Sequence, residues 1–464
     1  MSVCTAALWA GVVMTASLQN SGDTIFALSS APGRAGVAVF RVSGLEADVA
    51  LERLTQRALP PIREARTRRL YHRGEPLDMA LVLRLPGPGS FTGEDVVEIM
   101  THGSPAVVEG LAEALLAAGL RQAEPGEFTR RAFLNGRMDL LEAEGLADLI
   151  DADTEAQRKQ ALRQMEGGLS ARAEGWKDRI LDALAQVEGE IDFPDEADVP
   201  DRLSKEAGPG LVALADDLRT ALDQFGRGER VREGLRIAVI GAPNAGKSSL
   251  INALAGREAA IVTDIPGTTR DVVEVQLDIA GLPVRVADTA GLRDTDDVVE
   301  REGVRRARLN AREADIRILV VDSTAPQPDG SEHLERDDLV LLNKTDIGRS
   351  HAKAPIPEAV AHADAIATSL VDGSGLEEVL SWLEREVAAR YSPTRSAGLT
   401  RARHRDIVVR ALDAVERARA NLDVAPELAG EDLRGALLAM DELAGRADME
   451  AVLDRVFSRF CIGK

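Results

Sequence analysis

Cysteine, aromatic residues and positive net charge are all scarce in this chain of 464 residues. Its two cysteines, Cys4 and Cys461, are too few for a disulfide framework, which fits a reducing cytosol. Aromatic residues make up 3%, while Ala and Leu abound, which favours helix-rich packing. The formal net charge of −21 excludes a protein that coats nucleic acid by bulk attraction. Any nucleic-acid contact therefore needs a local basic patch or a partner.

Long apolar runs are absent as well. No run reaches the roughly 20 residues of a membrane-spanning helix, so we expect a cytoplasmic protein without a membrane partner. Residues 1–22 are mildly apolar but have no Lys or Arg in front of the apolar stretch, which disfavours a signal peptide. Because Met14 lies within this segment, a misplaced start codon explains the extra residues equally well. We expect this extra segment to be disordered.

The pattern along the chain predicts several domains, by the rule of about 150 residues each. Alternating runs such as "GVAVFRVSG" predict strands, "AVVEGLAEALLAAGL" predicts an amphipathic helix, and the strand–turn–helix order after Gly234 predicts a doubly wound α/β domain. Helical periodicity lies on both sides of that domain, with a break at Pro209. The fold class is thus multidomain α+β and α/β: an α+β domain at 23–134, a discontinuous helical domain at 135–232 and 391–464, and a P-loop α/β domain inserted at 233–390.

The stretch "LRIAVIGAPNAGKSSLINAL" has P-loop spacing. Gly241, Gly246, Lys247 and Ser248 follow an apolar strand and open a helix, which is the context that this motif requires. Backbone N–H groups and the helix amino end can hold phosphates, with Lys247 on the β- and γ-phosphates and Ser248 on Mg²⁺. A glycine turn that merely joins strand to helix is the alternative.

Further GTPase motifs follow in the expected order, each at a predicted strand end. "DIPGTTRD" can close over the γ-phosphate, "VADTAG" carries a metal-side carboxylate, and the carboxylate and amide of "NKTD" suit the edge of guanine. Together these motifs predict a GTPase. The expected nucleotide-binding residues are Asn244, Ala245, Gly246, Lys247, Ser248, Ser249, Thr263, Asp264, Ile265, Pro266, Gly267, Thr268, Thr269, Asp288, Thr289, Ala290, Gly291, Asn343, Lys344, Asp346, Thr368 and Ser369.

Leu292 stands where signalling GTPases usually have a water-orienting Gln, so hydrolysis needs help from elsewhere. The run "GAPNAGKSSLINALAGREAAIVTDIPGTTRDVV" resembles the tRNA-modifying GTPase family called MnmE or TrmE. So do "SFTGEDVVEIMTHG", "PGEFTRRAFLNGRMDLLEAEGLADLIDA" and the terminal "FCIGK". The resemblance extends from about Asp23 to Lys464, beyond the motifs that many GTPases share.

The resemblance implies a particular hydrolysis site. K⁺ would replace an arginine finger and be held by Asn244, Thr263, Ile265 and Thr268, while Ser248 and Thr269 would hold Mg²⁺. Lys247 and Glu300 would be catalytic, with Glu300 orienting the attacking water through another water. Without the resemblance, Asn244 reads as an ordinary loop residue and Glu300 as part of a solvated acidic loop.

The tail "CIGK" lacks the residues of a prenylation box. The resemblance implies instead that it folds back toward the N-terminal domain, where a tetrahydrofolate derivative, 5-formyl- or methylene-tetrahydrofolate, would contact Arg41, Glu98, Arg137 and Lys464. Without the resemblance these are surface charges and a strand residue facing water. A chemical role for Cys461 stays open, since a lone cytosolic Cys is usually a buried hydrophobe.

The resemblance implies a homodimeric, K⁺-stimulated GTPase that works with the flavoprotein MnmG on tRNA. Together they would install an aminomethyl or carboxymethylaminomethyl group at C5 of the wobble uridine. The basic stretches "REARTRRLYHRG" and "TRARHRD" are candidate tRNA contacts, with a solvated face as the alternative for each. Two rivals are a ribosome-assembly GTPase, which the absence of a basic C-terminal domain disfavours, and a membrane-anchored switch, which the tail and Leu292 disfavour.

Overall fold

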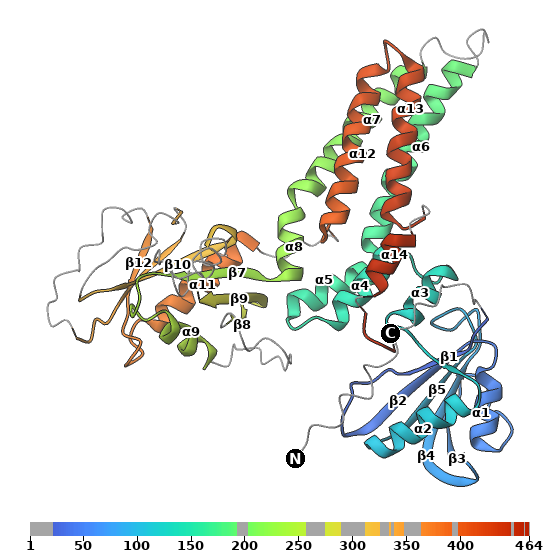
Figure 1. Ribbon diagram of the computed structural model, residues 1–464. Coiled ribbons are helices and arrows are strands. Elements are labelled where there is room, and N and C mark those ends of the chain that lie inside the picture. Colours follow the sequence, from blue (N-terminus) through green and yellow to red (C-terminus); the bar gives the residue numbers. More distant parts are fainter. Residues whose placement is uncertain are drawn as a thin grey trace, which may run out of the picture. The chain divides into compact units, whose positions relative to one another are not determined.

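The structure, a computed structural model, describes residues 22–192, 203–256, 274–288, 311–324, 334–335, 338–347, 363–391, 398–446, 450–458 and 460–463. The chain forms two compact units (Figure 1). One unit consists of Met1–Asp139 together with Asp448–Lys464, and the other of Leu140–Ala447. The C-terminal segment therefore belongs with the N-terminal domain rather than with the helices that precede it.

The first unit is an α+β fold built on a six-stranded sheet of order β3-β4-β5-β2-β1-β6. Neighbouring strands are antiparallel, except that β1 and β6 are parallel. Helices α1 and α2 contact β3, β4 and β5, and bury Leu51 and Leu115 against Phe40 and Ile99. The elements are β1 (Ile25–Leu28), β2 (Ala35–Ser43), α1 (Ala47–Thr55), β3 (Arg66–His72), β4 (Glu75–Leu85), β5 (Val96–Gly103), α2 (Pro105–Ala117), β6 (Arg121–Gln122), α3 (Glu127–Leu134) and α14 (Glu450–Phe457).

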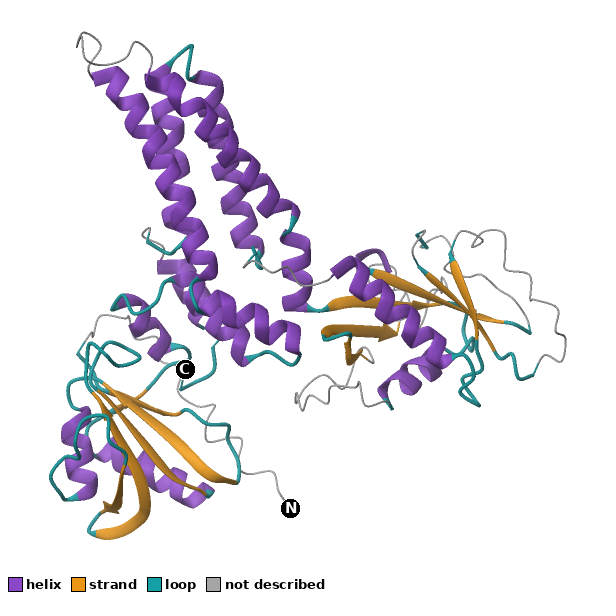
Figure 2. Cartoon of the chain, turned by 180° about the vertical axis from the view of Figure 1, so that it is seen from behind, coloured by secondary structure: helices purple, strands orange, loops and turns teal. Residues whose placement is uncertain are grey.

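A bundle of long helices forms part of the second unit (Figure 2). α6 and α7 precede the inserted domain and pack with α12 and α13, which follow it, around Trp176, Leu211, Val415 and Leu433. Among the described helices none has both the length and the apolar character to cross a membrane. The helices are α4 (Leu140–Ile150), α5 (Glu155–Met165), α6 (Gly168–Asp192), α7 (Leu203–Asp223), α8 (Phe225–Glu233), α12 (Ala402–Asn421) and α13 (Pro426–Leu443).

The expected break at Pro209 is wrong, because Pro209 lies inside α7. Proline removes one helical hydrogen bond and usually bends or ends a helix. Here the helix continues, since Leu211, Leu214 and Leu218 are completely buried in the bundle core and their burial outweighs the lost bond.

The inserted domain is a six-stranded sheet of order β12-β11-β10-β7-β9-β8, parallel except for the β8–β9 hairpin. β7 and β10 are buried almost throughout, as expected for parallel strands covered on both faces. The elements are β7 (Leu235–Ile240), α9 (Lys247–Ala255), β8 (Glu274–Ile279), β9 (Leu282–Asp288), β10 (Ile316–Asp322), β11 (Leu339–Asn343), β12 (Asp364–Ala367) and α11 (Leu376–Tyr391). The predicted fold class is thereby confirmed; the exact domain boundaries stay predictions.

Candidate nucleotide site

The loop between β7 and α9 requires glycine at two positions. Gly241 has φ 138° and Gly246 has φ 113°, a region that residues with a Cβ rarely adopt. A Cβ on Gly241 would lie 2.3 Å from the carbonyl oxygen of Val320, and one on Gly246 would lie 2.2 Å from Nδ2 of Asn343. Glycine thus lets the loop lie directly against β10 and β11, and the predicted "NKTD" motif begins at the end of β11.

Lys247 holds its charge inside this loop. Its Nζ donates to the carbonyl oxygens of Gly241 at 2.9 Å and Ala242 at 3.0 Å, and the residue is only 8% exposed. Because α9 begins at Lys247, the positive end of the helix dipole lies at the same loop. A buried ammonium beside a helix amino end favours a phosphate anion, which is the ligand that the P-loop motif predicts.

Asn343 joins the P-loop to the loop that follows β12. Its Nδ2 donates to the carbonyl oxygen of Ala245 at 2.8 Å, and its Oδ1 accepts from the N–H of Leu370 at 3.2 Å. The residue is 3% exposed. Both ends of the amide thus have protein partners, and its predicted contact with guanine stays a prediction.

The two segments predicted to contact the base lie next to each other. The backbone N–H and the hydroxyl of Thr345 donate to the carbonyl oxygen of Thr368 at 3.2 and 3.0 Å. Thr368 and Ser369 are completely buried, whereas Asp346 is exposed in the turn that follows β11. The fold therefore places an accessible carboxylate beside the buried start of the loop after β12.

Several predicted residues lie outside the described residues: 263–269, 289–291 and Glu300 of the nucleotide and cation sites, and Lys464 of the folate site. Asp288 is the last residue of β9, and its backbone is in register with Val239 of β7. Since the P-loop begins two residues after Val239, the carboxyl end of β9 lies at the same end of the sheet as the P-loop.

Sequence reasoning missed Asp322, the last residue of β10. Its Oδ2 accepts from Nζ of Lys344 at 2.5 Å, and its Oδ1 accepts from the N–H and hydroxyl of Thr324 at 2.9 and 2.6 Å. Burial alone would raise the pKa of Asp322, but the hydrogen bonds from Lys344 and Thr324 lower it to about 2. The carboxylate is therefore charged at neutral pH. The sequence signal that could have identified Asp322 is an acidic residue at the end of the strand that precedes the "NKTD" strand.

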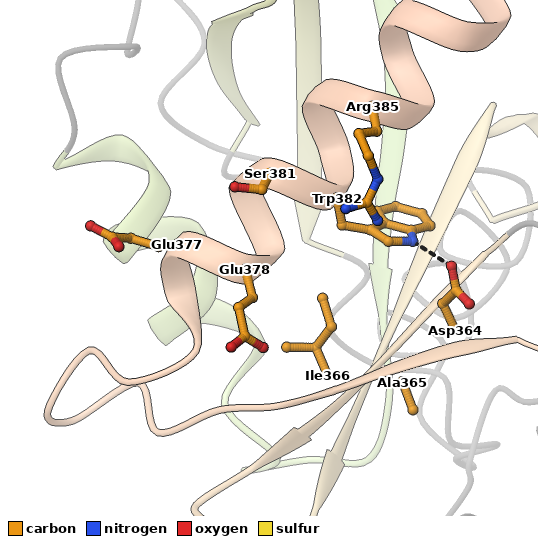
Figure 3. Close-up of a pocket in the computed structure, with 8 residues that line it drawn as sticks. All are labelled: Asp364, Ala365, Ile366, Glu377, Glu378, Ser381, Trp382 and Arg385. Atoms are coloured by element: carbon orange, nitrogen blue, oxygen red, sulfur yellow. Dashed lines mark hydrogen bonds between the residues drawn. The ribbon is translucent and has the colours of Figure 1, made fainter.

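A hollow of about 520 Å³ lies between β12 and α11 (Figure 3). At this hollow, Nε1 of Trp382 donates a hydrogen bond to Oδ2 of Asp364 at 2.8 Å. None of the residues predicted for the nucleotide lines it, so it is not the nucleotide site. The lining residues are Asp364, Ala365, Ile366, Glu377, Glu378, Ser381, Trp382 and Arg385.

In the first unit, Arg41 and Glu98 are paired across β2 and β5. They are register partners, and Nε and Nη2 of Arg41 donate to Oε1 of Glu98 at 3.2 and 2.9 Å. The guanidinium carbon lies 5.0 and 5.8 Å from the ring centres of Phe91 and Phe128, two residues that the sequence reasoning missed. Arg137 is exposed, and among the described residues its side chain has no hydrogen bond with Arg41 or Glu98.

The C-terminal tail packs on this unit, as the resemblance predicts. Ile462 pairs with Pro125 in an isolated bridge, and the carbonyl oxygen of Gly463 accepts from the hydroxyl of Ser29 at 3.0 Å. Gly463 has φ 97°, and a Cβ there would lie 2.3 Å from the carbonyl oxygen of Leu28. Cys461 is exposed, so the alternative of a buried apolar cysteine is wrong, and a chemical role for this residue stays open.

The stretch "TRARHRD" is partly buried: Ala402, Arg405 and Asp406 are exposed, and the other four residues are buried or half-buried. His404 is completely buried and its Nε2 lies 2.6 Å from Oε2 of Glu144, while Arg403 donates to the same oxygen at 3.1 Å. Arg401 donates to Asp148 at 2.6 Å. The interpretation as a wholly solvated face is therefore wrong for this segment, because Arg401, Arg403 and His404 are bonded inside the helical unit. Arg405 and Asp406 are exposed, and the contact of this segment with tRNA stays a prediction.

Comparisons with known proteins agree with this architecture. The sequence model of the MnmE helical domain matches residues 140–461, and that of the GTP-binding protein TrmE N-terminus matches 24–137. The G domain of the T. maritima FeoB iron transporter is 28% identical and covers 32% of this chain and 97% of its own, with a TM-score of 0.27, which is too low to carry an argument.

Full-length relatives are similar along almost the whole chain. The tRNA modification GTPase MnmE of Maricaulis maris is 52% identical over 95% of this chain and 99% of its own length. That of Caulobacter vibrioides is 50% identical over 95% of this chain and 100% of its own. With both family models and these relatives in agreement, the chain belongs to the MnmE (TrmE) family of tRNA modification GTPases.

Proposed function

We propose that this chain is a K⁺-stimulated GTP hydrolase that works with the flavoprotein MnmG to modify C5 of the wobble uridine in certain tRNAs. The observation that carries the proposal is the nucleotide site: Lys247 lies inside a glycine-dependent loop that Asn343 fastens to the base-side segments. The relatives bear the name of tRNA modification GTPases, which supplies the substrate class.

Two cations would assist hydrolysis. Ser248 lies in the first turn of α9 and is exposed, which fits a hydroxyl ligand for Mg²⁺, with Thr269 as the second protein ligand. Asn244 has φ 61° and is exposed in the loop, so its amide oxygen is accessible to K⁺. Thr263, Ile265 and Thr268 would be the other ligands. Such cations supply positive charge where it develops during phosphoryl transfer. Lys247 would stabilise that charge, and Glu300 would orient the attacking water.

A folate derivative would supply the carbon atom. The side chains of Arg41 and Glu98 are 21% and 17% exposed. The pair presents a cation and a carboxylate beside the rings of Phe91 and Phe128. This donor set fits a flat heterocycle with polar edges and an acidic tail. Arg137 and Lys464 would add positive charge for that tail. Cys461 is exposed and so accessible for a part in the chemistry.

We further propose a cytoplasmic homodimer in which GTP hydrolysis switches paired GTPase domains between open and closed states. For tRNA, "REARTRRLYHRG" and the exposed Arg405 of "TRARHRD" are the candidate contacts, and the first stretch has more exposed charge. It includes the edge strand β3, on which Arg66 and Arg69 are exposed.

The test is nucleoside mass spectrometry of total tRNA from cells with and without this gene. We expect loss of the aminomethyl-type C5 uridines without it, restored by the intact gene but not by Lys247→Ala. Lys159→Ala, which removes an exposed lysine in an ion pair with Glu155, is the matched control and should restore them. An unchanged nucleoside profile after deletion would refute the proposal and favour ribosome assembly instead.

The cation is tested separately by the rate of GTP hydrolysis in K⁺ and in Na⁺. We expect faster hydrolysis in K⁺, and loss of that preference in Asn244→Ala. Equal rates in both salts would refute K⁺ stimulation.

A further inference from the structure

We propose that Asp322 is a positioning residue for the guanine base, acting through Lys344. The inference rests on the proposed function, because it concerns the same nucleotide site. It starts from the parallel pair β10–β11, in which Asp322 and Asn343 are register partners at the carboxyl ends of their strands. The N–H of Ser323 also donates to the carbonyl oxygen of Asn343 at 2.9 Å. The turn after β10 is therefore fastened to the start of "NKTD".

The carboxylate of Asp322 is held on both oxygens. Oδ1 accepts two bonds from Thr324, at 2.9 and 2.6 Å, which fixes the orientation of the group. Oδ2 is then directed at Nζ of Lys344, at 2.5 Å. A charged pair of this kind forms a strong hydrogen bond with a defined direction, so the ammonium has a fixed position.

Lys344 also has an unusual backbone. Its φ of 66° lies in the left-handed region, which costs free energy for a residue with a long side chain and persists only where the surroundings require it. Its carbonyl oxygen accepts from the N–H of Ile347 at 3.2 Å, and the next residue, Thr345, is bonded to Thr368. The side chain is thus fixed at both ends, by the backbone at Cα and by Asp322 at Nζ.

Between these two fixed ends lie the four methylene groups of Lys344. Asp346, two residues further on, is the exposed carboxylate predicted to receive donors from the edge of guanine. A planar base held at its edge needs an apolar surface against one face, and lysine stems provide such surfaces when the ammonium is bound elsewhere. Because Asp322 holds the ammonium in one place, the stem between Nζ and Cα is left available to the base.

The experiment measures the affinity of full-length protein for fluorescent mant-GDP with Mg²⁺, and KM and kcat for GTP. Asp322→Ala should weaken GDP binding and raise KM about tenfold, the effect of losing one charged hydrogen bond. We expect kcat to stay within about twofold, because the base does not react. Asp322→Asn keeps the shape and the bonds to Thr324, and so tests the charge in a variant that folds. Glu313→Ala removes an exposed ion pair with Arg236, just before β10, and should leave the affinity unchanged.

A double-mutant cycle separates positioning from general stabilisation. Lys344→Met keeps the apolar stem but loses the ammonium, and combining it with Asp322→Ala should weaken binding no more than either change alone. Additive losses, or wild-type affinity in both Asp322 variants, would overturn the inference while leaving the proposed function intact. A wild-type protein that does not bind GDP would overturn both.

Discussion

Removal of Glu144 should strongly destabilise the helical unit. The side chain of Glu144 is 2% exposed. Its Oε2 accepts hydrogen bonds from Nε2 of His404 at 2.6 Å and from Nη2 of Arg403 at 3.1 Å. Its Oε1 lies 3.7 Å from Nε of Arg401. The N–H of Thr400 donates to Nδ1 of His404 at 3.4 Å, so the imidazole proton is on Nε2 and points at the carboxylate. One carboxylate therefore satisfies a buried donor and offsets two guanidinium charges.

Glu144→Ala should lower the free energy of unfolding by about 3–5 kcal/mol, the usual cost of removing one partner from a buried ionic network. Each arginine is less than one-fifth exposed, so water replaces little of the lost carboxylate. Glu144→Gln keeps an acceptor for His404 but loses the charge, and should cost less than Glu144→Ala. The exposed pair of Glu431 with Arg434, where Glu431 is 78% exposed, gives the matched control: Glu431→Ala should cost less than about 1 kcal/mol.

The assay is urea unfolding followed by the fluorescence of Trp176, which is buried in the bundle. Trp9 and Trp382 are replaced by Phe in all variants, so that the signal comes from the helical unit alone. A loss in Glu144→Ala no larger than that in Glu431→Ala would refute the reasoning, because it would mean that the cluster is worth no more than a solvated ion pair.

Three further predictions concern other residues. Gly246→Ala should abolish GDP binding measured by calorimetry, because the new Cβ would come within 2.2 Å of Nδ2 of Asn343 in a loop with φ 113°; wild-type affinity would contradict this geometry. Asp346→Asn should weaken GDP binding and favour xanthosine diphosphate, since the amide offers a donor where the carboxylate only accepts; unchanged preference would exclude Asp346 from base recognition. Burial raises the pKa of Asp148 to about 6 although Arg401 lowers it, so the folded chain takes up a proton as the pH falls through 6 and the unfolded chain does not. This proton uptake stabilises the folded chain as the pH falls, and Asp148→Asn lacks it. Between pH 7 and pH 5 the free energy of unfolding, measured by urea titration, should therefore fall more steeply for Asp148→Asn than for wild type. Parallel plots of this free energy against pH would refute the assigned pKa.

Much of the nucleotide site was predictable from the sequence because its parts are local. Gly241, Gly246 and Lys247 lie within one short loop, and the order of strand, glycine turn and helix is a property of neighbouring residues. The helical periodicity around the inserted domain likewise predicted the discontinuous bundle, because burial of an apolar helix stripe repeats every few residues. In both cases the physical cause acts over the same short span as the pattern.

The contacts between distant segments were decided only by tertiary structure. "TRARHRD" looks like a basic surface, but its histidine meets a glutamate 260 residues away and becomes part of a buried network. Arg41 meets Glu98 because β2 and β5 pair in that register, and Gly463 reaches Ser29, 434 residues earlier in the chain. The sequence alone determined which groups carry charge and where strands and helices form. The pairing of these charged groups depends on sheet register and helix packing. Register and packing follow from burial of the whole core rather than from any one segment.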